Sequence, residues 1–215
     1  MSDLSSTRYL DADSPAVQDF AARAVGGASD RHEMVRRLFV GVRDELRYDP
    51  YSLSMDPAGY VASAIAAQPG AYCVPKSILF VAACRAAGIP ARVGFADVRN
   101  HLQSDRLRTV MGTDLFRYHG YGAVKLDDRW FKASPAFNKE LCERFGVPPL
   151  DFDGTSDALL HAFSGDGSRY MEYVADHGTF EDVPLERLFQ VLRETYPALT
   201  EARIADAAAA DTAFA

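Results

Sequence analysis

The most informative segment of the chain is Cys73-Val-Pro-Lys-Ser-Ile-Leu-Phe-Val-Ala-Ala-Cys-Arg-Ala-Ala-Gly-Ile-Pro-Ala-Arg92. Its first half contains a continuous apolar run, which predicts a helix buried in the core. Gly88 and Pro90 predict where that helix ends, because glycine adopts the conformation that closes a helix and proline cannot continue one. We therefore expect a helix over residues 73–87 and a strand over residues 91–98.

Cys73 is the first residue of this predicted helix. The free N–H groups and the positive end of the helix dipole favour a thiolate there, which predicts a lowered thiol pKa and a nucleophile at the edge of a cleft. The same N–H groups can stabilise the oxyanion that forms when a carbonyl is attacked. The alternative is a buried, inert cysteine, because free cysteine is among the most buried residue types. Cys84 lies eleven residues further on, about 16 Å along a helix, so it is too far from Cys73 for a disulfide and is expected in the core.

A hairpin supplies the candidate base. Asp127-Asp128 predicts a two-residue turn between two strands, over residues 115–126 and 129–137. Counting back from the turn places His119 opposite Ala136, so that Ser134 and Asn138 become its diagonal neighbours on one face of the sheet. Either side chain can bind one imidazole nitrogen and leave the other nitrogen for a thiol.

Gly120 and Gly122 fall on the opposite face of the same strand, which leaves room for the Cys73 helix to pack closely. Taken alone, His119 is better explained as a strand histidine that binds backbone or water. The remaining histidines are interpreted as solvated or as local hydrogen-bond partners; they are His32, His101, His161 and His177.

The segment from Cys73 to Ala136 resembles the transglutaminase-like superfamily. The family typically has a catalytic Cys that opens a helix, and then a stretch similar to Cys84-Arg-Ala-Ala-Gly-Ile-Pro-Ala-Arg92. It then has a His followed two residues later by an aromatic, a Trp further on, and an Asp-Pro pair. The corresponding residues here are His119-Gly-Tyr121, Trp130 and Ser134-Pro135. The resemblance implies a papain-like α+β fold, Cys73 as nucleophile, His119 as base, and chemistry without a metal or other cofactor.

One position departs from the family pattern, since Ser134 occupies the place of the triad Asp. A serine cannot stabilise an imidazolium as a carboxylate does, although a thiol needs less activation than a hydroxyl. Asn138 can orient His119 as the amide does in a Cys-His-Asn site, and we rank it slightly above Ser134.

Three further residues are predicted to contact the substrate or its oxyanion. Gln68 precedes Cys73 by five residues, and its side-chain amide can complete an oxyanion hole; the alternative is a polar residue at a helix end. Tyr72 and Tyr121 neighbour the two catalytic candidates. The segment from Asp151 to Asp157 superficially resembles a calcium loop but lacks the ligand pattern of an EF-hand, so we interpret it as a turn and expect no metal.

The rest of the chain indicates one α+β domain, because predicted helices come first and strands follow. The expected elements are helices starting at Ser14-Pro15, at Ser29 or Asp30 and at Asp56-Pro57 (to Gln68), a polar loop or lid over 99–114, a hairpin over 159–174 and a helix over 185–196. We expect a single domain over residues 1–215, with its core at about 30–140 and a C-terminal elaboration at about 141–215.

Composition narrows the function. The chain of 215 residues has 23 basic and 30 acidic residues and a net charge of −7, which does not favour a nucleic-acid or anionic-membrane surface. No leader pattern and no run of about 18 apolar residues is present. Three cysteines in a chain of this size suit a reducing, cytoplasmic setting.

The leading hypothesis is cysteine-dependent acyl chemistry on an amide or peptide, either free or as part of a protein, with transfer to water or to an amine. A catalytically impaired binding module is the main alternative, because the family Asp is replaced by Ser134. Acyl transfer from a thioester donor is a third. Substrate identity, acceptor and oligomeric state do not follow from the sequence.

Overall fold

The computed structural model of the protein describes residues 3–101, 103–159, 171–200, 211 and 214. Its helices are α1 (Pro15–Val25), α2 (Arg31–Glu45), α3 (Ala62–Ile65), α4 (Cys73–Ala86), α5 (Asp105–Met111), α6 (Lys139–Arg144), α7 (Leu185–Thr195) and α8 (Pro197–Thr200), with 3-10 turns η1 (Pro50–Ser52) and η2 (Pro57–Tyr60). Its strands are β1 (Arg47–Tyr48), β2 (Gly70–Ala71), β3 (Ala91–Asn100), β4 (Leu115–Leu126), β5 (Arg129–Ala133) and β6 (Met171–Phe180).

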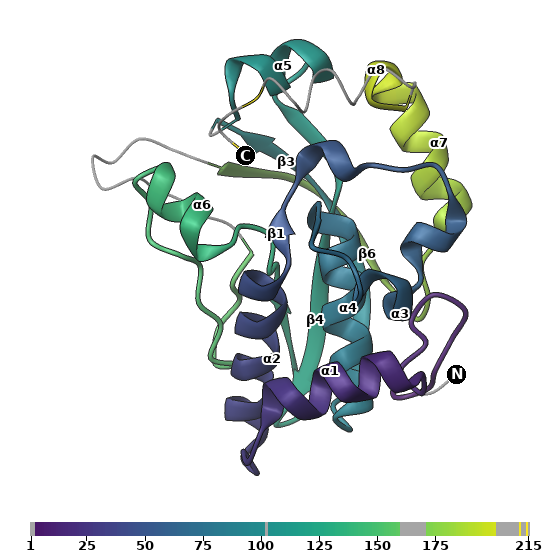
Figure 1. Cartoon of the computed structure of the whole chain (residues 1–215), viewed down its shortest axis with the longest axis vertical. Coiled ribbons are helices and arrows are strands. Elements are labelled where there is room, and N and C mark those ends of the chain that lie inside the picture. The colour runs from purple at the N-terminus through teal and green to yellow at the C-terminus, as the bar shows by residue number, and fades with distance from the viewer. Residues whose placement is uncertain (1–2, 102, 160–170, 201–210, 212–213, 215) are drawn as a thin grey trace.

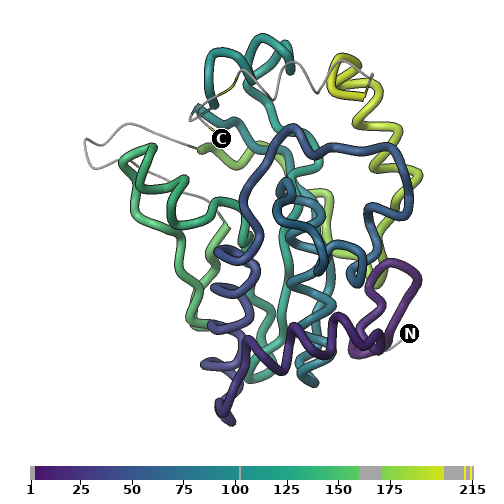
Figure 2. Tube along the Cα trace, in the orientation of Figure 1, coloured from purple at the N-terminus to yellow at the C-terminus, as the bar shows by residue number. Residues whose placement is uncertain are grey.

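Helix α4 is the centre of the core, as its apolar sequence predicts. Every residue from Cys73 to Arg85 is buried, which fits a helix that is apolar on all sides. Helices α1 and α2 pack against it, and β3 and β4 pack against it as well (Figure 1). Gly88 follows with a φ of +75°, the left-handed conformation that ends a helix. In the trace of Figure 2, α4 lies between the first two helices and the sheet.

The main sheet has the strand order β5-β4-β3-β6, and all its neighbouring strands are antiparallel. Leu126 pairs with Arg129, and Asp127 and Asp128 between them have φ values of 47° and 61°. Two left-handed residues are what a tight hairpin turn requires, so the predicted turn is confirmed. The α+β class is also confirmed.

Two glycines of β4 let α4 lie directly on the sheet. A Cβ added at Gly120 would come 2.8 Å from Cα of Val74, and one at Gly122 would come 2.6 Å from the ring of Phe80. Both distances are shorter than real carbon contacts, so only glycine fits here. The predicted packing of the Cys73 helix on this face is confirmed.

Three predicted elements differ from the structure. The helix expected from Asp56 to Gln68 is divided into η2 and α3, because Val61 has an extended conformation. The expected loop over 99–114 contains α5, whose first turn is capped by the Ser104 hydroxyl. The strand expected to reach Phe137 ends at Ala133, where the bridge from Ala133 to Ala158 adds another segment to the edge.

The expected hairpin over 159–174 lies mostly outside the described residues, as does His161. Within the described ranges, no helix combines the length and apolarity that a membrane span requires.

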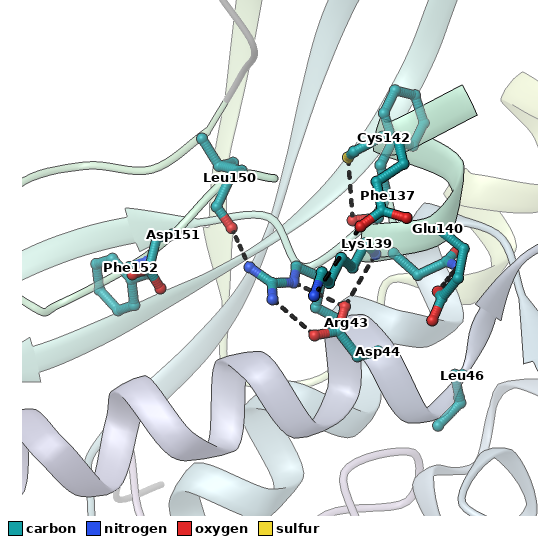
Figure 3. A network of polar contacts seen from close by, with 12 residues as sticks. Arg43, Asp44, Leu46, Phe137, Lys139, Glu140, Cys142, Leu150, Asp151 and Phe152 are labelled. Atoms are coloured by element: carbon teal, nitrogen blue, oxygen red, sulfur yellow. Dashed lines mark hydrogen bonds and ion pairs between the residues drawn. The ribbon is translucent and has the colours of Figure 1, made fainter. Parts of the chain in front are cut away.

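A buried polar network holds the segment after β5 against α2. Arg43 donates from Nη1 to the carbonyl of Leu150 (2.7 Å) and from Nε and Nη2 to the carboxylate of Asp44. Asp44 in turn accepts from the backbone N–H of Lys139 at 3.0 Å. Figure 3 shows this guanidinium between α2 and the chain around Leu150. The network fixes the position of the α6 segment next to the candidate site.

Candidate active site

A small pocket, with a cavity volume of about 40 Å³, lies at the N-terminal end of α4. It is lined by Tyr48, Pro50, Leu53, Tyr72, Cys73, Met111, Phe116, Arg117, Tyr118, His119, Leu192, Tyr196 and Leu199. The structure therefore brings Cys73 and His119, which are 46 positions apart in the sequence, to one pocket. Each is only 5% exposed, because α5, α7 and α8 stand at this end of the sheet (Figure 1).

The Cys73 thiol is held in a dry environment. Burial raises its pKa to about 11, although the backbone N–H groups of Gly120, Val74 and Cys73 itself act in the opposite direction. The expectation that the helix N-terminus would lower this pKa is therefore wrong, because loss of water outweighs the amide dipoles. The thiol is protonated at neutral pH unless a base takes its proton.

The His119 ring is oriented by Ser134. Its Nε2 lies 3.0 Å from the Ser134 hydroxyl, and that hydroxyl donates to the carbonyl oxygen of Gly120 at 3.1 Å. A carbonyl can only accept, so the single hydroxyl proton points to Gly120 and the hydroxyl oxygen accepts from Nε2–H. This arrangement selects the tautomer that leaves Nδ1 unprotonated and able to accept a proton.

Burial lowers the pKa of His119 to about 4. The imidazole is therefore neutral at pH 7. Its partner Ser134 has no negative charge, so it does not offset the desolvation of the ring. The thiol and the imidazole that line this pocket are thus both neutral at pH 7, in contrast with a thiolate–imidazolium ion pair.

Asn138 does not orient His119, so its ranking above Ser134 is wrong. Its Oδ1 accepts from the backbone N–H of Tyr48 at 3.0 Å, and its Nδ2 donates to Glu140 at 2.7 Å. The reason is that β5 ends at Ala133, so the chain leaves the sheet before the alternation reaches Asn138.

The three predicted substrate contacts have different outcomes. Tyr72 lines the pocket, and its hydroxyl is 2.7 Å from that of Tyr60.

Gln68 and Tyr121 are not among the lining residues. Gln68 follows the short helix α3, where its N–H donates to Ile65, and the Tyr121 hydroxyl donates to Asp176 at 2.9 Å. Those two expectations are corrected.

A second polar cluster, absent from the sequence predictions, lies immediately before His119. Tyr118 has a φ of +55°, and its N–H donates to Asp97 at 3.0 Å. Asp97 also lies 2.8 Å from Nε2 of His177, and the rings of Tyr118 and His177 are 4.5 Å apart. Burial raises the pKa of Asp97, but the bonds from His177 and Tyr118 outweigh it and the net pKa is lowered. Asp97 thus supports a left-handed residue directly next to the candidate base.

Among the described residues, no group of histidines, cysteines and carboxylates has a geometry that could hold a metal ion. In the segment considered as a calcium loop, Asp153 accepts from the N–H and the hydroxyl of Thr155. This is the hydrogen bonding of a turn.

Comparison with known protein families gives a match over more than half of the chain. Residues 18–135 match the family model of the transglutaminase-like superfamily. Curated proteins give no match. Among solved structures, the chain is similar to a crystal structure from Cytophaga hutchinsonii described as a "putative cysteine protease", with 16% identity and a TM-score of 0.49 over 84% of this chain and 55% of that chain. The chain thus spans about half of that protein's length.

Proposed function

Because the chain belongs to the transglutaminase-like superfamily, we propose that Cys73 and His119 perform cysteine-dependent acyl chemistry on an amide or peptide. The observation that supports this most is the shared pocket: a thiol and an imidazole with a defined tautomer line one largely apolar cavity. Hydrolysis is the simplest outcome, with water as the acceptor.

The resting pair suits a general-base mechanism. Nδ1 of His119 accepts the thiol proton as sulfur attacks the carbonyl carbon, so charge develops only as the new C–S bond forms. The imidazolium then donates that proton to the leaving amine as the C–N bond breaks. Water attacks the resulting thioester with His119 again as the base, which releases the acid and restores the thiol.

The pocket wall favours an apolar acyl group. Its lining consists mainly of aliphatic and aromatic side chains, and Arg117 is the one charged side chain among the described residues that line it. The Tyr196 hydroxyl donates to the carbonyl of Leu115, so it is not available to a substrate. A substrate with an aliphatic or aromatic side chain next to the scissile carbonyl gains from burial in such a cavity.

Turnover of a panel of acyl p-nitroanilides tests the proposal. The wild-type protein is expected to release nitroaniline from apolar acyl groups in preference to acidic ones. Cys73→Ala should abolish release, and Cys84→Ala, at a fully buried site remote from the pocket, should retain it. Equal rates in the wild type and Cys73→Ala would exclude Cys73 as the nucleophile.

A catalytically impaired binding module is the second candidate, and the protonation states favour it. Burial raises the thiol pKa and lowers the imidazole pKa, and no carboxylate faces His119 at Ser134. In that case apolar amides bind without turnover. Binding of the same anilides, measured by calorimetry with no release of nitroaniline, would support the module.

A further inference from the structure

One tyrosine hydroxyl at the pocket makes no hydrogen bond to the described residues. Tyr48 lines the pocket together with Cys73 and is only 3% exposed. Its backbone N–H is bonded to Asn138, but no hydrogen bond of the described chain involves its hydroxyl. A tyrosine hydroxyl that lines the pocket and has no bond to the described chain is available to a ligand atom.

The surroundings of Tyr48 fix its ring. Strand β1 pairs in parallel with β2, and Tyr48 is the partner of Ala71 in this pairing. Ala71 precedes Cys73 by two residues. The ring packs edge-on against that of Phe137, with the ring centroids 4.8 Å apart.

The backbone around the ring is also held in place. The N–H of Tyr48 donates to the side chain of Asn138, and the N–H of the neighbouring Lys139 donates to Asp44 at 3.0 Å. The hydroxyl is therefore presented by rigid elements, as a preorganised donor requires.

Of the three other tyrosines that line the pocket, two have engaged hydroxyls, whereas no hydrogen bond of the described residues involves the hydroxyl of Tyr118. The hydroxyls of Tyr72 and Tyr60 share a hydrogen bond, and the Tyr196 hydroxyl donates to the carbonyl of Leu115. Gln68, the side chain expected to complete an oxyanion hole, does not line the pocket. A position for a second oxyanion donor thus remains open beside the N–H groups at the start of α4.

We propose that Tyr48 is a catalytic residue whose hydroxyl donates a hydrogen bond to the oxyanion formed when Cys73 attacks a carbonyl. The inference rests on the proposed acyl chemistry. During the attack the C–S bond forms, the thiol proton moves to His119, and the carbonyl π electrons move to oxygen. Tyr48 keeps its proton and stabilises that oxygen by a hydrogen bond. Burial raises the pKa of Tyr48 well above its ordinary value, so the hydroxyl remains a donor throughout the neutral range.

Tyr48→Phe tests this role, because it removes the hydroxyl and keeps the ring that packs on Phe137. Two reactions at Cys73 are compared at pH 7: acylation by p-nitrophenyl butyrate, which passes through an oxyanion, and alkylation by iodoacetamide, which does not. Loss of one oxyanion donor is expected to slow acylation about 100-fold, while the alkylation rate stays within about twofold. Tyr51→Phe is the matched control, since that hydroxyl binds Asp211 at 2.7 Å and does not line the pocket.

Three other outcomes overturn the inference. Unchanged acylation in Tyr48→Phe would show that the hydroxyl does not stabilise the oxyanion. An equal fall in both rates would mean that Tyr48 acts on the thiol or on the fold. If the wild-type Cys73 is neither alkylated nor acylated at pH 7, the acyl chemistry itself fails, and the role of Tyr48 fails with it.

Discussion

The hydroxyl of Ser134 lies 3.0 Å from Nε2 of His119 and donates its proton to the carbonyl of Gly120. One serine therefore sets the direction in which the imidazole can accept a proton. It does so without a negative charge, so it leaves the pKa of His119 low. The imidazole is therefore neutral at pH 7, with its Nδ1 unprotonated.

Ser134→Ala removes this acceptor. The Nε2–H of His119 is then buried without a partner, which is expected to lower the free energy of unfolding by about 1–3 kcal/mol. The alkylation rate of Cys73 at pH 7 should also fall, because both tautomers become populated. Ser77→Ala is the control, since the Ser77 hydroxyl is buried without a partner and its loss should leave stability unchanged or slightly raised. Equal destabilisation in the two variants would refute the role of Ser134.

Gly120→Ala tests the contact between α4 and the sheet. The new Cβ would meet backbone of Val74 at 2.8 Å, which side-chain rotation cannot relieve. We expect destabilisation of about 1–3 kcal/mol by chemical denaturation, as for other overpacked cores. Gly59→Ala, where the added Cβ meets nothing within 4 Å, should change stability by less than about 1 kcal/mol. A mild effect at Gly120 would mean that α4 lies further from β4.

Asp97→Ala removes the acceptor that supports Tyr118. The left-handed residue loses its backbone partner, so a loss of about 1–3 kcal/mol is expected at pH 7. Because the pKa of Asp97 is lowered in the folded state, its contribution is present above the unfolded pKa and is lost as pH falls through the folded pKa. The stability difference between wild type and variant should thus shrink in acid. Asp114→Ala, which breaks a half-exposed pair with Arg99, should cost less than about 1 kcal/mol.

Lys76 gives a prediction for alkaline pH. Its fully buried ammonium donates to the carbonyls of Arg43 and Leu46, and burial lowers its pKa to about 7, against about 10.4 in the unfolded chain. Between these values the unfolded state binds the extra proton, so the contribution of Lys76 to stability rises with pH. The wild type should gain about 2–3 kcal/mol relative to Lys76→Met from pH 7 to pH 9, measured by urea unfolding. A constant difference would show that Lys76 does not titrate in this range.

The residues of α4 and the hairpin turn were predictable because their signals are local. A continuous apolar run determines a buried helix wherever it occurs, and Asp127-Asp128 sets the strand register without help from distant residues. Ser134 was therefore found as a neighbour of His119. Its ranking against Asn138 failed because the end of β5 depends on the segment around Ala158, which pairs with it from far along the chain.

Other features depend on contacts that no local pattern reveals. Tyr48 reaches the pocket through the pairing of β1 with β2, and Asp97 meets His177 from another strand. The thiol pKa was predicted in the wrong direction because α5, α7 and α8 close the pocket, and the sequence alone does not show where those helices pack. In contrast, helix α5 could have been predicted from Ser104, which is a typical helix-capping residue. A loop was predicted instead because the residues around Ser104 are polar.

The most direct test of the central claim is the rate of Cys73 alkylation by iodoacetamide from pH 5 to pH 10, followed by mass spectrometry in the wild type and in His119→Ala. The buried Cys84 and Cys142 serve as internal references. If His119 accepts the thiol proton, the wild-type rate at pH 7 should exceed that of the variant at least about tenfold. Its profile should be nearly flat above the imidazole pKa of about 4, while the variant rate climbs with pH toward the thiol pKa of about 11. Identical rates and pH profiles in the two proteins would contradict the proposed pair.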